Sequence, residues 1–226
     1  MSHENKQDEL NQIADNISAC TKCELHKTRT NTVPGHGSCD AKVLFIGEAP
    51  GEQEDKEGIP FCGRAGKFLD EMIESIGYKR EDVFICNTLK CRPPENRDPK
   101  DKEKEVCKPY LLKQVSVIEP RLIVTLGRHS TETYLPGTGG ISKLHGKPVR
   151  RPNGQVYLPL YHPAAALHNG GLRQTLLDDF ARIPGILKKI DETTRSNTDD
   201  IEKESADQAR HQSQTPDKAG KQTKLL

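Results

Sequence analysis

The chain lacks long apolar runs and an apolar leader. Among its 226 residues there is no stretch of about 18 consecutive apolar residues, so we expect no transmembrane helix. The first six residues, MSHENK, lack the apolar centre of a signal peptide. We therefore expect a cytoplasmic protein whose cysteines stay reduced.

The chain also lacks a strong excess of charge of either sign. Its formal net charge is +1 at pH 7. Such a balance does not by itself indicate a nucleic-acid partner, so local clusters carry more weight. Residues 143–151 form one such cluster, with two lysines, two arginines and a histidine.

Hydrophobic residues make up only 33% of the chain and are scarcest near its C-terminus. Residues 191–226 contain no aromatic residue, and their large aliphatics are Ile201, Leu225 and Leu226. The same stretch holds eight acidic and six basic residues. It cannot bury enough apolar surface to offset the entropy of ordering. We predict a folded domain over residues 1–190 and a disordered charged tail over 191–226.

Within the folded part, short apolar runs alternate with amphipathic segments. We expect strands at residues 42–46, 83–85, 122–126 and 156–160, and helices at 6–19, 63–77, 100–119, 128–134 and 172–190. Residues 24–41, 92–99 and 136–154 are expected to be loops, the last with room for one short strand. Pro109 is expected to kink or break its helix. The alternation predicts an α/β fold with a parallel sheet flanked by helices.

Acidic residues crowd the end of the first predicted strand. Its apolar run ends at Gly47, and Pro50 and Gly51 prevent regular structure from continuing. The acidic residues of this break are Glu48, Glu52, Glu54 and Asp55. In open α/β sheets, ligands bind beyond the carboxyl ends of the strands, and glycine lets a substrate approach the backbone. The segment therefore predicts a binding site, the alternative being a solvated acidic turn.

Four of the seven cysteines have the spacing of a metal site. Cys20 and Cys23 form a CxxC pair that can chelate one metal centre, and Cys91 and Cys107 can complete a four-thiolate set. Four thiolates suit zinc and an iron–sulfur cluster equally well. The alternative is a redox pair or a chance spacing. A redox CxxC normally opens a helix after a strand, whereas this one follows a predicted helix.

The other three cysteines are not expected to bind metal. Cys86 lies in a predicted strand, where a free cysteine behaves as a small buried hydrophobic residue. Cys39 and Cys62 lie in predicted loops and are candidates for surface thiols.

Four sequence blocks follow one another along the chain: residues 47–55 (GEAPGEQED), 58–66 (GIPFCGRAG), 87–97 (NTLKCRPPENR) and 162–167 (HPAAAL). Together they resemble the family four uracil-DNA glycosylases, the iron–sulfur-containing branch of the uracil-DNA glycosylase superfamily. The similarity extends over roughly residues 10–190, and the blocks combined with the cysteines are far more specific than any one of them. The resemblance implies a three-layer α/β/α fold around a mostly parallel four-stranded sheet.

The resemblance also implies a cofactor. It assigns a [4Fe–4S] cluster to Cys20, Cys23, Cys91 and Cys107, with a structural rather than a catalytic role. One position departs from the better-known branch of the superfamily, which carries an aspartate where this chain has Ala49. Another group is therefore expected to activate the water. Glu48 is the first candidate, Glu54 is the second, and the main chain is a further alternative.

The remaining implied roles follow the chemistry of breaking a glycosidic bond in a base that has been flipped out of DNA. His162 would donate a hydrogen bond to O2 of the leaving uracil, its alternative being a structural histidine. Asn87 would read the Watson–Crick edge, the alternative being a strand-end cap. Phe61 would stack on the base rather than belong to the core. Gly47 and Ala49 of the first block would adjoin the substrate.

The expected partner is uracil-containing DNA, single- or double-stranded, bound by a monomer. Leu167 resembles the apolar wedge of a minor-groove loop, its alternative being packing at a helix start. Glu52 and Asp55 are expected to be solvated. The tail is a candidate contact for a repair or replication partner. Candidate phosphate contacts are Arg64, Arg92, Arg97, Lys143, Lys147 and Arg150.

The sequence thus predicts a monofunctional glycosylase that starts base excision repair without cleaving the strand, because no lysine is expected to form a Schiff base. Two alternatives come from other classes: a non-catalytic iron–sulfur nucleic-acid-binding protein and an electron carrier. A third is a relative that traps uracil-DNA covalently through a histidine, for which His145 lies in the corresponding region.

Overall fold

The computed structural model describes residues 1–194, and its contacts divide the chain into two units, residues 1–187 and 188–226. The sheet and the helices around it belong to the first unit. In the second unit, residues 188–194 are helical. The disorder predicted from residue 191 is therefore wrong for 191–194, and the rest of the predicted tail lies outside the described residues.

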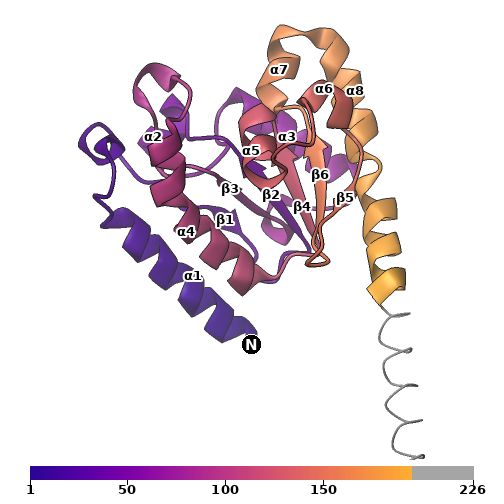
Figure 1. The fold of residues 1–226 in the computed structure, drawn as a ribbon, viewed down its shortest axis with the longest axis horizontal. Helices are drawn as coiled ribbons and strands as arrows, with labels where there is room; N and C mark the ends of the chain where they lie inside the picture. Colours follow the sequence, from indigo (N-terminus) through magenta and orange to yellow (C-terminus); the bar gives the residue numbers. More distant parts are fainter. Residues whose placement is uncertain (195–226) are drawn as a thin grey trace, which may run out of the picture. The chain divides into compact units, whose positions relative to one another are not determined.

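A six-stranded sheet with the order β1-β3-β2-β4-β6-β5 forms the centre of the first unit (Figure 1). Its strands are β1 (His36–Gly37), β2 (Val43–Gly47), β3 (Phe84–Asn87), β4 (Leu122–Leu126), β5 (Val149–Arg150) and β6 (Val156–Leu160). The four inner strands are parallel, as predicted, whereas β1 and β5 pair antiparallel at the two edges. The predicted number of strands, four, was too low because β1 and β5 have only two residues each, too few to give an apolar pattern in a sequence.

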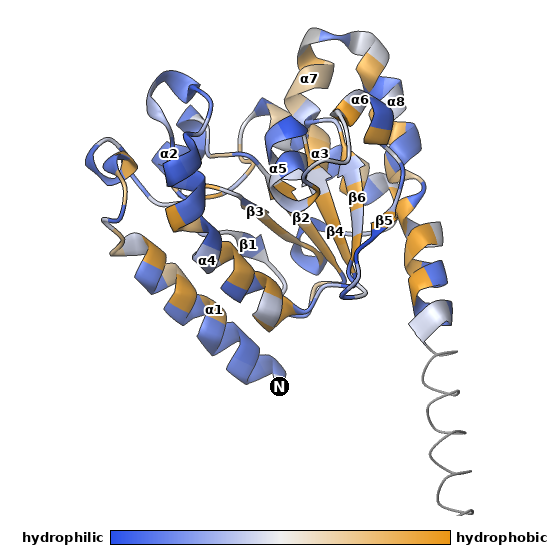
Figure 2. Ribbon diagram, viewed as in Figure 1, coloured by the Kyte–Doolittle hydropathy of each residue, from blue (hydrophilic) through white to orange (hydrophobic). Residues whose placement is uncertain are grey.

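The inner strands are buried on both faces, which is why they read as uninterrupted apolar runs (Figure 2). Successive side chains of β2 point to opposite faces. Leu44 and Ile46 pack into the cluster that also contains Ile13. Phe45 points the other way and stacks on Phe180, with ring centroids 5.6 Å apart.

Helices cover both faces of the sheet, as the three-layer prediction required (Figure 1). On one face, α1 and α4 lie side by side, while α3, α7 and α8 contact one another. None of the described helices combines the length and apolarity that a membrane span requires. The helices are α1 (His3–Ser18), α2 (Glu52–Glu57), α3 (Arg64–Ser75), α4 (Asp101–Ile118), α5 (Arg128–Tyr134), α6 (Ile141–Leu144), α7 (Pro163–His168) and α8 (Gly170–Phe180).

Three expectations about helices differ from the structure. Helix α4 continues through Pro109, because that residue is exposed and water can solvate the carbonyl that the missing N–H leaves free. The closing helix predicted at 172–190 is interrupted after Phe180 and resumes at residue 183. Helix α6 lies in a predicted loop, and no helix was predicted at α2 or α7, since six residues or fewer give little periodicity.

The strand connections place a crevice at the carboxyl edge of the sheet. After β2 the chain passes through α2 and α3 to β3 on one side, whereas after β4 it passes through α5 to β6 on the other. Connections that diverge from two neighbouring strands leave a crevice beyond their carboxyl ends, where ligands of open α/β sheets bind. The residues that follow β2 and β4 are therefore prime candidates for function.

Candidate functional site

A pocket of about 390 Å³ opens at this carboxyl edge. Its volume falls within the range of about 300–1,000 Å³ typical of small-ligand pockets. Segments far apart in the sequence line it, and six of the predicted site residues are among them. The lining residues are Glu48, Ala49, Pro50, Gly51, Glu54, Phe61, Ala65, Asn87, Pro93, Asn96, Arg97, His162 and Ala164.

Asn87 reaches the pocket through the register of the sheet. It pairs with Gly47 at the ends of β3 and β2. A Cβ at Gly47 would lie 2.3 Å from Asn87 Oδ1 and 2.6 Å from the ring of Phe61, so only glycine lets these side chains lie against the strand end. Asn87 is 2% exposed, and its amide forms no hydrogen bond with another described residue. Both the donor and the acceptor of this amide are thus available to a ligand.

His162 follows β6 and caps α7, and this position fixes which ring nitrogen carries the proton. Its Nδ1 accepts a hydrogen bond from the backbone N–H of Ala164 at 3.2 Å. The proton of the neutral ring therefore resides on Nε2. Desolvation lowers the pKa of His162 to about 4, against the opposing effect of the negative charge of Glu54. At neutral pH the ring is an uncharged hydrogen-bond donor.

Phe61 forms a wall of the pocket beside His162. The two rings stack with centroids 5.4 Å apart and planes 26° apart. Phe61 adopts a left-handed backbone conformation with φ of 50°, which costs free energy for a bulky residue. A Cβ at Gly66 would lie 1.7 Å from the Phe61 carbonyl oxygen, so the start of α3 packs directly under this turn. The strained turn holds an aromatic face at the pocket.

The carboxylate of Glu54 joins two loops of the pocket. Its Oε2 accepts a hydrogen bond from the Gly51 N–H at 3.1 Å, and its Oε1 accepts bonds from the N–H groups of Cys62 and Gly63, each at 3.1 Å. Both oxygens are therefore engaged by the backbone. The contacts suit Glu54 to fixing the loops around Phe61.

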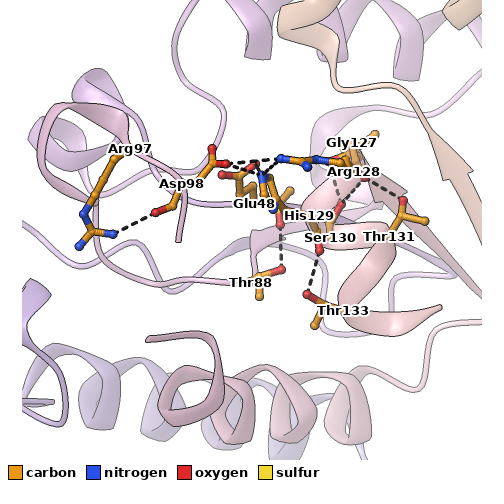
Figure 3. Close-up of polar contacts among 12 residues, drawn as sticks. Glu48, Thr88, Arg97, Asp98, Gly127, Arg128, His129, Ser130, Thr131 and Thr133 are labelled. Carbon is orange, nitrogen blue, oxygen red and sulfur yellow. Dashed lines mark hydrogen bonds and ion pairs between the residues drawn. The ribbon is translucent and has the colours of Figure 1, made fainter. Parts of the chain in front are cut away.

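The carboxylate of Glu48 has a different environment, shown in Figure 3. Oε2 of Glu48 lies 3.8 Å from Nε2 of His129, and the backbone carbonyl of Glu48 accepts a bond from Leu89 N–H at 3.0 Å. Burial raises the pKa of Glu48, and the positive charges of His129 and Arg128 oppose this effect. Glu48 is thus a partly desolvated carboxylate at the pocket wall.

His129 and its neighbour Asp98 were not predicted as site residues. Nε2 of His129 lies 3.3 Å from Oδ2 of Asp98, in addition to its contact with Glu48 (Figure 3). His129 follows the carboxyl end of β4 as Glu48 follows that of β2. A position just after a predicted parallel strand could have identified His129 as a candidate site residue. However, His129 lies in a predicted helix, and the residues that it contacts are distant in the sequence.

Two predictions about solvation are wrong. Asp55 is 4% exposed, because it lies in the first turn of α2 and both its oxygens accept the backbone N–H of Thr30, at 3.0 and 3.1 Å. Cys39 is buried rather than a surface thiol, and it contacts His3. Cys86 is buried as predicted, and Cys62 is partly buried.

The four predicted metal-binding cysteines surround one small cavity of about 20 Å³. Cys20 and Cys23 follow α1, Cys91 follows β3, and Cys107 lies on α4. Burial raises the pKa of the Cys107 thiol to about 11 and raises those of Cys23 and Cys91. Desolvated thiols gathered from three chain segments are the donor set of a soft metal centre.

Positive groups lie next to these thiols. Arg29 donates a hydrogen bond from NH1 to Sγ of Cys91 at 3.2 Å. The buried ammonium of Lys90 opposes the effect of burial on the pKa of Cys107, and it donates to Oε1 of Gln114 at 2.7 Å. Cationic donors beside cysteines favour the thiolate form that metals require.

The cysteine cavity and the pocket share a wall. Ala49, which lines the pocket, packs against the buried cluster of Leu89 and Cys91. Asp55 anchors α2 to Thr30, the residue after Arg29. Through these contacts the chain segments that carry the cysteines support the segments that carry Glu48 and Asn87.

The residues predicted to contact DNA do not all remain free. The guanidinium of Arg97 binds both oxygens of Glu103, at 2.6 and 2.9 Å, and Nε of Arg92 donates to Asn96 at 2.8 Å. Leu167 lies on α7 and is 37% exposed. The exposed basic candidates are Arg64, Lys143, Lys147 and Arg150.

Comparison with known proteins is consistent with this architecture. Residues 34–182 match the uracil DNA glycosylase superfamily. The chain is 48% identical over 184 residues to the type-4 uracil-DNA glycosylase of Sulfurisphaera tokodaii, covering 78% of this chain and 84% of the relative. It is 41% identical over 180 residues to that of Thermotoga maritima, covering 78% and 94%. The chain therefore belongs to the uracil DNA glycosylase superfamily, in the type-4 branch of that family.

Proposed function

We propose that this protein is a monofunctional uracil-DNA glycosylase, which flips uracil out of DNA and hydrolyses its N-glycosidic bond to start base excision repair. One observation carries the proposal: a single pocket collects an amide, an aromatic face, a neutral histidine and a carboxylate. These four groups match the four tasks of the reaction. The names of the type-4 relatives support the same substrate.

In this proposal Asn87 and Phe61 recognise the flipped base. The amide of Asn87 donates to uracil O4 and accepts from N3–H, a pattern that cytosine reverses. The ring of Phe61 provides a stacking face, and the backbone at Gly47 and Ala49 lets the base approach closely.

His162 would stabilise the leaving group. Uracil departs with negative charge on O2, and the Nε2–H of the neutral ring can donate to that oxygen. The low pKa keeps the ring uncharged at neutral pH, so His162 acts as a hydrogen-bond donor and not as a charged acid. The backbone N–H of Ala164 holds the ring in the required tautomer.

Glu48 would orient the attacking water and stabilise the positive charge that develops on the sugar. Its carboxylate is held at the pocket wall without a backbone donor on each oxygen, unlike that of Glu54. We therefore assign the water to Glu48 and a loop-positioning role to Glu54.

The absence of lysine from the pocket lining, among the described residues, favours a monofunctional reaction. The covalent-trapping alternative needs a histidine at the sugar, yet His145 is not among the lining residues. Its Nδ1 instead pairs with Oδ2 of Asp179 at 2.7 Å. A purely nucleic-acid-binding protein would not need Asn87 and His162 in one pocket.

We propose that Cys20, Cys23, Cys91 and Cys107 hold a [4Fe–4S] cluster. A tetrahedral zinc site holds four sulfurs about 2.3 Å from one ion and thus close together. These cysteines are not among the described groups of three ligand atoms within 4.8 Å of one another, which favours an iron–sulfur cluster over a single zinc ion. When bound, the cluster would cross-link three chain segments beneath the pocket.

Replacing Cys91 with serine is expected to remove most of the iron. The free energy of unfolding should fall by about 5 kcal/mol, which lowers the melting temperature by roughly 10–20 °C. Iron and sulfide content and thermal unfolding of anaerobically purified protein are the measurements. Cys62→Ser, outside the four-cysteine set, serves as the control. Full iron content in Cys91→Ser would contradict the ligand assignment.

Leu167 provides a test of how the protein holds DNA. An exposed leucine near the pocket can fill the gap that a flipped base leaves in a duplex, but single-stranded DNA has no such gap. Leu167→Ala should therefore lower excision from double-stranded DNA by about tenfold, a cost of one small apolar contact. Excision from single-stranded DNA should change little. Equal losses on both substrates would argue for packing of α7 instead.

A labelled oligonucleotide with one deoxyuridine tests the proposed function directly. Strand cleavage that appears only after alkali indicates an abasic product and a monofunctional glycosylase. The same oligonucleotide with deoxycytidine should remain intact. Protein that retains its iron but excises no uracil would rule out the enzyme and favour a binding protein. Gel filtration of the full chain tests the expected monomer. Residues 191–226 stay the proposed contact for a repair or replication partner.

A further inference from the structure

Lys90 is a buried basic side chain that the proposed reaction does not use. It is 1% exposed and is among the largest fully buried side chains of the protein. Its Nζ donates a hydrogen bond to Oε1 of Gln114 at 2.7 Å. An ammonium has three donors, so one amide oxygen satisfies neither its hydrogen-bonding capacity nor its charge. Burial of such a charge is costly unless an anion lies close to it.

The carboxylates of the described residues do not supply that anion. The buried ones are already engaged, in the pairs Asp55 with Thr30, Glu103 with Arg97, and Asp179 with His145. Within residues 1–194, the ion pairs of lysine join other lysines to carboxylates, and none includes Lys90. The counter-charge of Lys90 must therefore have another source.

The cysteine cavity lies next to this ammonium. Lys90 lines the cavity together with the four predicted metal-binding cysteines and directly precedes Cys91 in the chain. Burial raises the pKa of the Cys107 thiol, and the charge of Lys90 opposes this effect. The same two influences act on the thiol of Cys86. Arg29, the cation that donates to Cys91, is only partly buried, so Lys90 is the buried positive charge of this region.

We propose that Lys90 is the buried counter-charge of the iron–sulfur cluster, which helps to retain the cluster and raises its reduction potential. The inference rests on the proposed [4Fe–4S] cluster and adds a residue that does not ligate it. Four thiolates outweigh the positive charge of the iron–sulfur core, so the loaded site is an anion. Away from water, its attraction to an ammonium is strong. Reduction adds negative charge, and a nearby positive charge therefore favours the reduced state.

The test uses neutral variants of Lys90 in the full chain, purified anaerobically with the cluster. Lys90→Gln keeps an N–H donor for Gln114 but removes the charge, whereas Lys90→Met removes both. In each variant the midpoint potential of the cluster, followed by a spectroscopic redox titration, should shift downward. Release of iron to an excess of chelator should become at least about tenfold faster, because groups that support metal ligands contribute roughly 10–100-fold to affinity.

Two further variants are controls. Lys22 also lines the cysteine cavity, but it is exposed, with its Nζ 5.1 Å from the centroid of the Tyr110 ring. Water and salt screen its charge, so Lys22→Met should change the potential much less than the same substitution at Lys90. Gln114→Met removes the hydrogen-bond acceptor of Lys90 and keeps the ammonium. Its potential should not fall.

The direction of the shift separates this proposal from a purely structural role. A loosened interior would admit water, which also stabilises the more charged reduced state and would raise the potential. An unchanged or raised potential in both neutral variants, or the same downward shift in Gln114→Met or Lys22→Met, would overturn the proposal. If both neutral variants purify without iron, retention of iron by Gln114→Met supports the need for the charge, and loss of iron from Gln114→Met as well contradicts it.

Failure of the earlier proposals can be recognised separately. Wild-type protein without iron and sulfide would remove the cluster itself, whatever the variants show. Wild-type protein with its cluster but without uracil excision would remove the proposed function and leave the role of Lys90 to be decided by the potentials.

Discussion

Replacement of His162 by alanine is expected to lower the rate of uracil excision by roughly 10²–10³-fold, the usual cost of losing one preorganised donor to a developing anion. The ring has its proton fixed on Nε2 by the Ala164 N–H, so alanine removes a donor that is already oriented in the pocket. The loss should appear in the single-turnover rate and hardly in DNA affinity. A variant within threefold of wild type would remove His162 from the mechanism.

The pH dependence of stability gives a second readout of the same variant. The folded-state pKa of His162 is about 4, below its ordinary value, so the unfolded chain binds the proton first on acidification. The contribution of this group to stability is therefore complete above about pH 6.5 and is lost as the pH falls toward about 4. His162→Ala should lose less stability than wild type over this interval in thermal unfolding measurements.

Replacement of Asn87 by aspartate is expected to reduce uracil excision by roughly 10³-fold, because the pocket then presents only acceptors to the O4 acceptor of uracil. The side chain is buried against Gly47, so it cannot turn away to water. Any excision that remains should shift toward cytosine, whose exocyclic amine is a donor at the same place. Rates on matched uracil and cytosine oligonucleotides measure this change.

Asn87→Leu removes the hydrogen bonds of the amide without placing a carboxylate opposite uracil O4. Comparison with Asn87→Asp therefore separates the loss of hydrogen bonds from the repulsion between acceptors. Leucine branches at Cγ as asparagine does but carries no polar atom, so this variant should lose uracil excision without gaining cytosine excision. If Asn87→Asp kept wild-type excision of uracil, the assignment of base recognition to this residue would be wrong, and its buried position would reflect a structural cap. Iron content of both variants should match wild type, since Asn87 is not among the residues that line the cysteine cavity.

Much of the architecture was accessible from local sequence. The spans of β4, α5 and β6 were predicted without error, because a buried parallel strand is a continuous apolar run and each run ends at a glycine or a polar residue. The same logic located Glu48, Asn87 and His162 at strand ends. The cysteines were grouped by a spacing rule and a resemblance, and the structure brings all four to one cavity.

Local sequence was insufficient where a residue's role depends on what packs against it. Asp55 has the sequence environment of a solvated acidic turn, and only the approach of Thr30 from another segment explains its burial. Glu54 and Glu48 are both acidic residues of one loop. Their difference arises because the backbone of residues 62 and 63 occupies the oxygens of Glu54, whereas a histidine faces Glu48.

The sequence by itself determined the α/β class, the parallel strands, the superfamily and the residues able to take part in uracil excision. It did so because hydrophobic periodicity and catalytic residue types are local properties of the chain. Only the tertiary structure decided the tautomer and low pKa of His162, the different contacts of the Glu48 and Glu54 carboxylates, and the meeting of His129 with Glu48. Hydrogen bonds, desolvation and Coulomb forces act between atoms that the fold brings within a few ångströms, whatever their separation along the chain.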